Sequence, residues 1–218
     1  RDEKEILSEA KELRKSGVKE LLIVAQDTTA YGNRKGLPKL LEKLSKLPNS
    51  FEWIRLMYCH PLGVTDDLIE TIAALPNVLH YIDMPLQHIT DPILDKMNRR
   101  YTRAHIENTI NRLRKRIPDI TIRTTFLVGF PGETPAMHKE LLNFVNMIEF
   151  DRMGAFAYSP EEGTAAAKFA KCPSEKKVKA RIEELLYAQN EIIHKQNVKL
   201  IGKKTKVIVD EIIDGAFI

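Results

Sequence analysis

The stretch Ile120-Thr-Ile-Arg-Thr-Thr-Phe-Leu-Val-Gly-Phe-Pro-Gly-Glu-Thr134 decides the fold. Its first nine residues are mostly apolar or β-branched, which is typical of a β-strand. A turn with two glycines and a proline follows, and Thr134-Pro135 suits the N-cap and first residue of a helix. Such a unit aims backbone N–H groups and a helix N-terminus beyond the strand end, where a nucleotide or a carboxylate can bind.

The same alternation of strand and helix runs along the chain. The unbroken apolar run 18–25 predicts a strand covered on both faces. Apolar residues at helical spacing lie between the strands, which are expected at 18–25, 51–58, 78–84, 120–128 and 153–158. Each crossover returns the chain to the same edge of the sheet, so the strands should be parallel and the class α/β.

Polar residues gather after the strands, at 26–32, 59–61, 85–88, 129–133 and 159–164. Barrels and doubly wound sheets both place their sites on this rim. The chain opens on a helix, whereas a parallel βα array normally opens on a strand. We therefore expect a first strand and its loop to precede Arg1.

Composition limits the class of protein. With 218 residues, 43% of them hydrophobic, the chain can bury the core of one domain and carry an appendage. No apolar run approaches the roughly 20 residues that span a bilayer, and the start does not resemble a signal peptide, so we expect a cytoplasmic protein without membrane contact. Cys59 and Cys172 lack metal-cage spacing, and each is expected to be a lone thiol.

The C-terminal part is basic. Residues 171–206 hold ten Lys or Arg against four Glu, within a net charge of +4 for the chain. This predicts a possible RNA contact there, although a solvated lysine-rich helix face has the same pattern. Ser174 should begin a long amphipathic helix that ends near Gly202, and 203–209 alternates like a half-buried strand. The expected divisions are a core at 1–170, a linker helix at 171–202 and the first strand of a truncated β domain at 203–218.

Four blocks of sequence resemble a known family: Val-Ala-Gln-Asp-Thr-Thr-Ala-Tyr-Gly at 24–32, Tyr-Ile-Asp-Met-Pro-Leu-Gln-His at 81–88, Val-Gly-Phe-Pro-Gly-Glu-Thr at 128–134 and Ala-Tyr-Ser-Pro-Glu-Glu-Gly-Thr at 157–164. They are similar to the radical S-adenosylmethionine methylthiotransferases, and within them to the RimO-type branch, which modifies an aspartate of ribosomal protein uS12. The sister branch modifies adenosine in tRNA and differs in the first block.

The resemblance implies a TIM-like partial barrel of six strands, of which the first is missing from this sequence. It also implies a [4Fe–4S] cluster on a three-cysteine loop after that strand, an N-terminal domain with a second cluster, and a C-terminal TRAM domain. The cysteine loop is absent here, so residues 1–218 are expected to bind neither cluster. We assign no catalytic or metal-binding residue within them.

The implied chemistry uses S-adenosylmethionine and an external electron donor. Reduction by the first cluster gives a 5′-deoxyadenosyl radical, which abstracts hydrogen from the β-carbon of the aspartate before a methylthio group is installed. The protein must orient the cofactor and keep water away from the radical.

Several residues are candidates for cofactor contact. The turn residues Gly129, Phe130, Gly132 and Glu133 either cradle the adenosyl moiety or form a tight turn with glycines at positive φ. Gln26 and Asp27 either bind the cofactor or, for Asp27, cap a turn with Thr29. Gln87 is the preferred contact on its loop.

Further candidates lie on two strands and their loops. Arg123 and Thr125 share a strand face, where Arg123 meets a ligand carboxylate or a structural partner. His88, Tyr158 and Ser159 are candidate substrate contacts, although structural roles are favoured for all three.

Two other functional classes remain open. A metal-dependent barrel hydrolase could draw ligands from Cys59, His60, His88 and Asp27, although no HxH or HxxE pairing supports it. A ribosome or RNA adaptor could use the basic helix.

Overall fold

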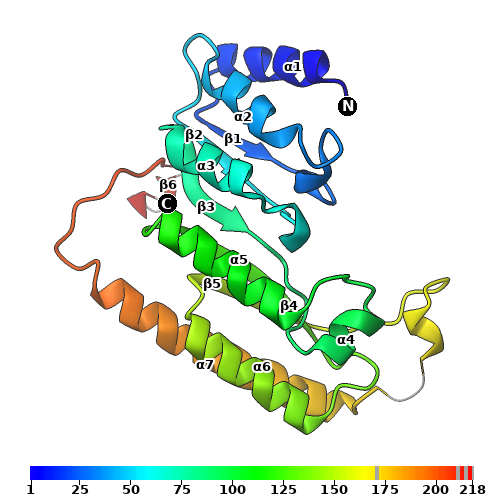
Figure 1. Ribbon diagram of the computed structural model, residues 1–218. Coiled ribbons are helices and arrows are strands. Elements are labelled where there is room, and N and C mark those ends of the chain that lie inside the picture. Colours follow the sequence, from blue (N-terminus) through cyan, green and yellow to red (C-terminus); the bar gives the residue numbers. More distant parts are fainter. Residues whose placement is uncertain (170–171, 210–211, 214–215, 218) are drawn as a thin grey trace.

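The computed structural model describes residues 1–169, 172–209, 212–213 and 216–217. Five strands form one parallel sheet in the order in which they occur along the chain (Figure 1). They are β1 Glu20–Ile23, β2 Trp53–Leu56, β3 Val78–Asp83, β4 Thr121–Val128 and β5 Arg152–Ala157. The predicted α/β class and parallel sheet are confirmed, and the sequential strand order agrees with the predicted partial barrel.

Helices connect the strands as the periodicity predicts. They are α1 Glu3–Lys15, α2 Leu37–Ser45, α3 Asp66–Ala74, α4 Asp91–Lys96, α5 Arg103–Arg116, α6 Pro135–Ile148 and α7 Glu175–Val198, with short 3-10 turns at Thr28–Ala30, Pro61–Gly63 and Ala166–Lys168. The Thr134 hydroxyl accepts a hydrogen bond from the Met137 N–H at 3.2 Å, which confirms the predicted N-cap of α6.

No helix in the described part of the chain is both long enough and apolar enough to cross a membrane.

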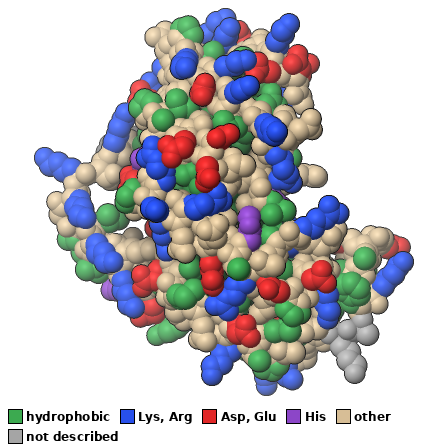
Figure 2. All heavy atoms as spheres, in the orientation of Figure 1, with side chains coloured by type: hydrophobic (Ala, Val, Ile, Leu, Met, Phe, Trp, Pro, Cys, Tyr) green, Lys and Arg blue, Asp and Glu red, His purple; other side chains and the backbone are tan. Residues whose placement is uncertain are grey.

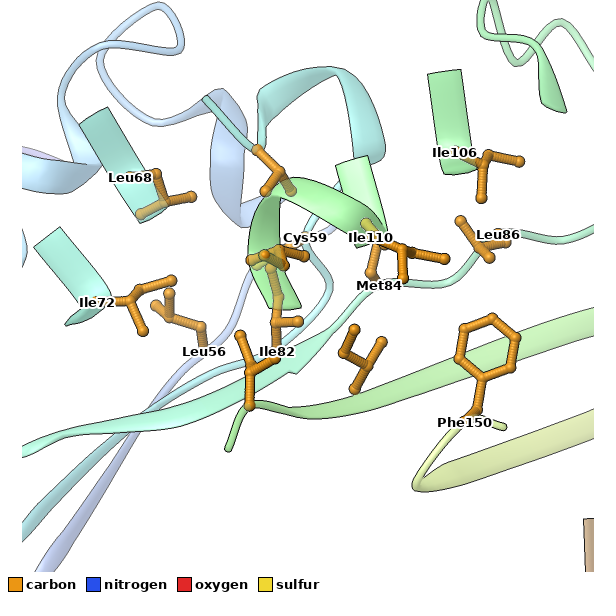
Figure 3. Close-up of a cluster of buried hydrophobic side chains, with 14 of the residues drawn as sticks. Leu56, Cys59, Leu68, Ile72, Ile82, Met84, Leu86, Ile106, Ile110 and Phe150 are labelled. Carbon is orange, nitrogen blue, oxygen red and sulfur yellow. The ribbon is translucent and has the colours of Figure 1, made fainter. Parts of the chain in front are cut away.

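The core lies between the sheet and the helices that cover one of its faces. Along β4 the side chains alternate, with Ile122, Thr124, Phe126 and Val128 buried and the intervening residues half-buried on the other face. Figure 3 shows Leu56 and Ile82, from β2 and β3, among side chains of α3 and α5. Hydrophobic burial on this single face holds the sheet and helices together.

The prediction that 18–25 forms a strand covered on both faces is wrong. The strand spans only Glu20–Ile23, and Leu22 and Val24 are 51% and 57% exposed. The physical reason is position, because β1 is an edge strand that pairs only with β2 among the described strands.

The expected strand at 203–209 is also wrong. These residues have no regular secondary structure, and α7 ends at Val198, short of Gly202. An extended segment needs a neighbour to form a ladder. The short strands that do pair lie further on, at β6 Ile212–Ile213 and β7 Ala216–Phe217. Residues 210–211, 214–215 and 218, which belong to the expected domain 203–218, lie outside the described residues.

Helix α7 packs against β5 and α6 (Figure 1). Among the apolar residues of this predicted amphipathic helix, Leu185 and Ile192 are buried, whereas Leu186 is 38% exposed. Near its start, Val178 lies against the turn that follows β4: a Cβ added to Gly129 would be 2.5 Å from the Val178 Cγ2. The helix and the turn are therefore in direct contact.

Replacing Gly129 by Ala is expected to destabilise the protein for two separable reasons. Gly129 has φ +84°, which costs an L-residue about 1–2 kcal/mol, and the clash with Val178 adds about 1–3 kcal/mol. In the G129A/V178A double variant the clash is relieved and the φ cost stays. Urea unfolding of both variants and of V178A alone measures the two contributions. If the double variant lost as much unfolding free energy as the two single variants together, the clash between an alanine at position 129 and the Val178 side chain would be contradicted.

Candidate functional site

The carboxyl ends of β1 to β4 surround a cavity of about 220 Å³, called the rim cavity below. It is lined by Gln26, Tyr58, Cys59, His60, Pro85, Gln87, Arg99 and Thr125. Three of the predicted site residues, Gln26, Gln87 and Thr125, meet there. Larger hollows lie beside β1, about 400 Å³, and at the amino ends of β2 to β5, about 1030 Å³. We place the site at the rim because parallel sheets bind ligands beyond their carboxyl ends.

Two residues of the rim cavity have left-handed backbones. Tyr58 has φ +53° and Gln87 has φ +68°, both uncommon for residues with a side chain. The Gln87 N–H donates to the Thr125 carbonyl and its carbonyl accepts from the Leu127 N–H, both at 2.8 Å. Strained backbone conformations persist only where surrounding contacts hold them, and they are concentrated at ligand sites.

Asp83, at the end of β3, organises the wall of this cavity. Its carboxylate is fully buried and accepts from the Arg123 Nη1 at 2.9 Å and from the Tyr58 N–H at 3.1 Å. The Cys59 N–H donates to the Asp83 carbonyl at 2.8 Å. Arg123 therefore has a structural partner, the second of its two predicted alternatives. Asp83 was not among the predicted site residues, although a lone carboxylate at the end of an apolar strand was the available signal.

Asp27 also has partners within its own loop. The Thr29 hydroxyl donates to the Asp27 Oδ1 at 2.5 Å, and the Arg34 Nη2 lies 3.1 Å from the Asp27 Oδ2. The turn that Asp27 was predicted to cap is present. Its carboxylate is thus occupied in folding the loop.

The turn after β4 is closed by its own glutamate. Gly129 and Gly132 have φ +84° and +92°, as predicted for a tight turn. The Glu133 side chain is fully buried, accepts from the Gly129 N–H and lies 3.0 Å from the Arg181 Nη1 of α7. This geometry turns the carboxylate inward, so Glu133 supports the turn and leaves any ligand contact to backbone groups.

An aromatic cluster flanks this turn. Phe130 is buried and packs edge-on against Tyr158, with ring centroids 5.0 Å apart, and against Phe169 at 6.2 Å. Ser159 is exposed. The cluster shields one side of the turn from water, which gives Phe130 and Tyr158 a packing role.

His88 is fully buried and does not line the rim cavity. Its Nδ1 accepts from the Thr90 N–H at 3.1 Å. Burial, and then the nearby charges of His138 and Arg181, lower the pKa of His88 to about 4. A neutral imidazole packed in the interior fits the structural alternative and not a contact to substrate.

The ligands proposed for a hydrolase metal do not assemble. No group of three His, Cys, Asp or Glu side chains suited to a metal occurs within the described ranges. Cys59 is buried, and burial raises the pKa of its thiol, which keeps it protonated. Cys172 is exposed and follows Cys59 by 113 positions in the sequence.

Comparison with known proteins gives a consistent result. Residues 1–145 match the model of the Radical SAM superfamily. Proteins named ribosomal protein uS12 methylthiotransferase RimO are 49% identical in Clostridium kluyveri, over 94% of this chain and 47% of that protein, and 49% identical in Carboxydothermus hydrogenoformans, over 97% and 49%. The chain spans about half the length of these curated relatives.

Two solved structures share the fold. The coproporphyrinogen III oxidase HemN from Escherichia coli, a radical SAM enzyme, matches 82% of this chain and 40% of its own at a TM-score of 0.62 and 19% identity. The hydrogenase maturase HydG matches 89% and 43%, at a TM-score of 0.55 and 13% identity. At such identities the likeness concerns the fold alone.

Replacing Arg123 by Leu is expected to cost about 3 kcal/mol of unfolding free energy, because it leaves the Asp83 carboxylate buried without a cation. Arg152 is the matched control. It lies beside Arg123 in the sheet register but is exposed, and its guanidinium bonds only to the Asp151 carbonyl among described residues. R152L should change stability by less than about 0.5 kcal/mol in urea titrations. Equal effects in the two variants would rule out the buried pair.

Stability should fall between pH 6.5 and pH 4 through His88. Its pKa is about 4 when folded and near 6.5 when unfolded, so the unfolded chain binds the extra proton as the pH drops. The full loss is about 3 kcal/mol. Unfolding free energies of the wild type and H88Q across this range measure it. A slope that is unchanged in H88Q would show that other groups cause the acid sensitivity.

Proposed function

We propose, since the chain belongs to the radical SAM superfamily, that it is the radical SAM part of a longer protein that methylthiolates the β-carbon of an aspartate in ribosomal protein uS12. The observation that carries the proposal is 41–49% identity, over 94–97% of the chain, to proteins that bear the name of that activity. The polar cavity at the strand ends provides a place for the reaction.

S-adenosylmethionine suits the residues of the rim cavity. Their side chains offer two amides, two hydroxyls and a guanidinium whose buried Nε has no hydrogen-bond partner among described residues. The cavity is below the usual range for a whole ligand, so it suits one end of the cofactor. Bound cofactor would supply hydrogen-atom abstraction once reduced. The protein's part is then to hold polar groups with Gln26, Gln87 and Thr125 and to keep the turn 129–133 rigid.

An iron–sulfur cluster does not fit the residues of this chain. Cluster iron is held by cysteine thiolates, and Cys59 and Cys172 are the two cysteines present, one of them buried. We therefore derive no step through a cluster from these residues. The two clusters, like the electron donor that must reduce the cofactor, belong to the proposal for the longer protein.

The proposal places the protein in the cytoplasm, where its ribosomal substrate is made. It includes an RNA contact through the basic C-terminal part. The space-filling view shows basic side chains, all of them lysines in the sequence, along the segment that follows α7 (Figure 2). Lys203 and Lys204 there are exposed, and an exposed basic segment attracts phosphates.

Mass spectrometry of uS12 tests the function. Deleting the gene should remove one methylthio group from a uS12 aspartate, and restoring the full-length protein should return it. A gene variant that lacks the region encoding these residues is the control for the complementation. If uS12 is unchanged by deletion while a tRNA adenosine loses a methylthio group, the sister activity replaces the one proposed.

A further inference from the structure

Carboxylates near the strand ends are balanced by arginines. Three such pairs occur within ion-pairing distance: Asp27 with Arg34 at 3.1 Å, Asp83 with Arg123 at 2.9 Å and Glu133 with Arg181 at 3.0 Å. Each of these carboxylates is therefore paired with a cation of the protein itself. None of the three needs a ligand to balance its charge.

Arg99 is the exception at this rim. It lines the rim cavity, its Nε is buried, and that atom has no hydrogen-bond partner among the described residues. Nor is Arg99 a partner in any ion pair between described residues. Placing a cation partly out of water without an anion is unfavourable. An anion supplied from outside the fold would remove that cost.

The backbone around Arg99 is fixed before any ligand binds. Arg99 lies in the connection between α4 and α5, where its N–H donates to the Leu94 carbonyl at 2.9 Å. Two residues later the Tyr101 hydroxyl donates to the Leu86 carbonyl, also at 2.9 Å. Asn98 and Arg100, on either side, have left-handed backbones. Ligand binding therefore requires little additional ordering of this segment.

The charge of the rim cavity indicates the kind of anion. Arg99 is the one Lys or Arg among its lining residues. The amides of Gln26 and Gln87 and the hydroxyls of Tyr58 and Thr125 are neutral donors. Burial lowers the pKa of His60. A planar guanidinium matches a carboxylate through two parallel hydrogen bonds. A phosphate group carries nearly two charges and would leave one of them unbalanced in so small a cavity.

We infer that Arg99 is the carboxylate-binding residue of the rim cavity. Its guanidinium holds the carboxylate of a ligand, and the neutral amides and hydroxyls around it bind the ligand's other polar groups. The inference rests on the proposed function, which supplies two ligands with this chemistry. One is the methionyl part of S-adenosylmethionine, and the other is the target aspartate of uS12.

Binding measurements on the full-length, cluster-loaded protein test the inference. The variants are R99Q, R99K and the neighbour control R100Q, which removes the same charge from an exposed residue outside the cavity. Dissociation constants are measured for S-adenosylmethionine and its decarboxylated analogue, and for uS12 and its target Asp-to-Asn variant. Thermal unfolding shows whether each protein is folded.

R99Q should raise the dissociation constant of one of the two carboxylate ligands by about 10- to 100-fold. R99K should raise it by less, and R100Q by under about twofold. The matching ligand without the carboxylate should bind the wild type and R99Q with equal affinity. Whichever of the two ligand pairs shows this difference contains the carboxylate that Arg99 binds. Equal loss with and without the carboxylate, or no loss for either pair, overturns the inference. If wild type binds no uS12, the proposed function fails, yet the cofactor pair still decides the role of Arg99.

Discussion

The carboxylate of Asp83 is the interaction on which the rim depends. A fully buried charge must be paired and hydrogen-bonded, and Asp83 meets both needs through Arg123 on β4 and the Tyr58 N–H after β2. One side chain at the end of β3 therefore joins the strands on either side of it. It also holds Tyr58 in its left-handed conformation, which shapes one wall of the rim cavity.

The sequence predicts the elements well wherever burial repeats at a regular interval. Ile106, Ile110 and Leu113 recur at helical spacing, and all three are buried on α5. The strand 120–128 and the cap at Thr134 are equally local, since each depends on neighbours within a few residues. The parallel sheet then follows from the order of the elements, and the rim from the sheet. Gln26, Gln87 and Thr125 could be placed together for that reason.

The pairings that decide each role could not be predicted, because they join residues distant in sequence. Arg123 reaches Asp83 across 40 positions, and Arg181 reaches the Glu133 carbonyl across 48. Those contacts assign structural roles to side chains that chemistry alone made candidates for ligand binding. Arg99 illustrates the converse, since no motif marks it. Its position in the rim cavity and its buried Nε, which has no partner among the described residues, distinguish it from the exposed Arg100. The errors at 18–25 and 203–209 have the same origin, because strand exposure depends on neighbours in space.

Helix α7 changes how the basic part of the chain should be viewed. Its inner face buries Leu185 and Ile192, and the Gln189 amide donates to the Phe150 carbonyl at 2.8 Å. Arg181 neutralises Glu133, whose carboxylate closes the turn after β4. Residues that a linker would leave in solvent thus support the site, and α7 packs as the last helix of the core. The lysines of α7 are exposed to solvent, and the residues that line the rim cavity all lie outside this helix, so a partner bound by the lysines would not occupy that cavity.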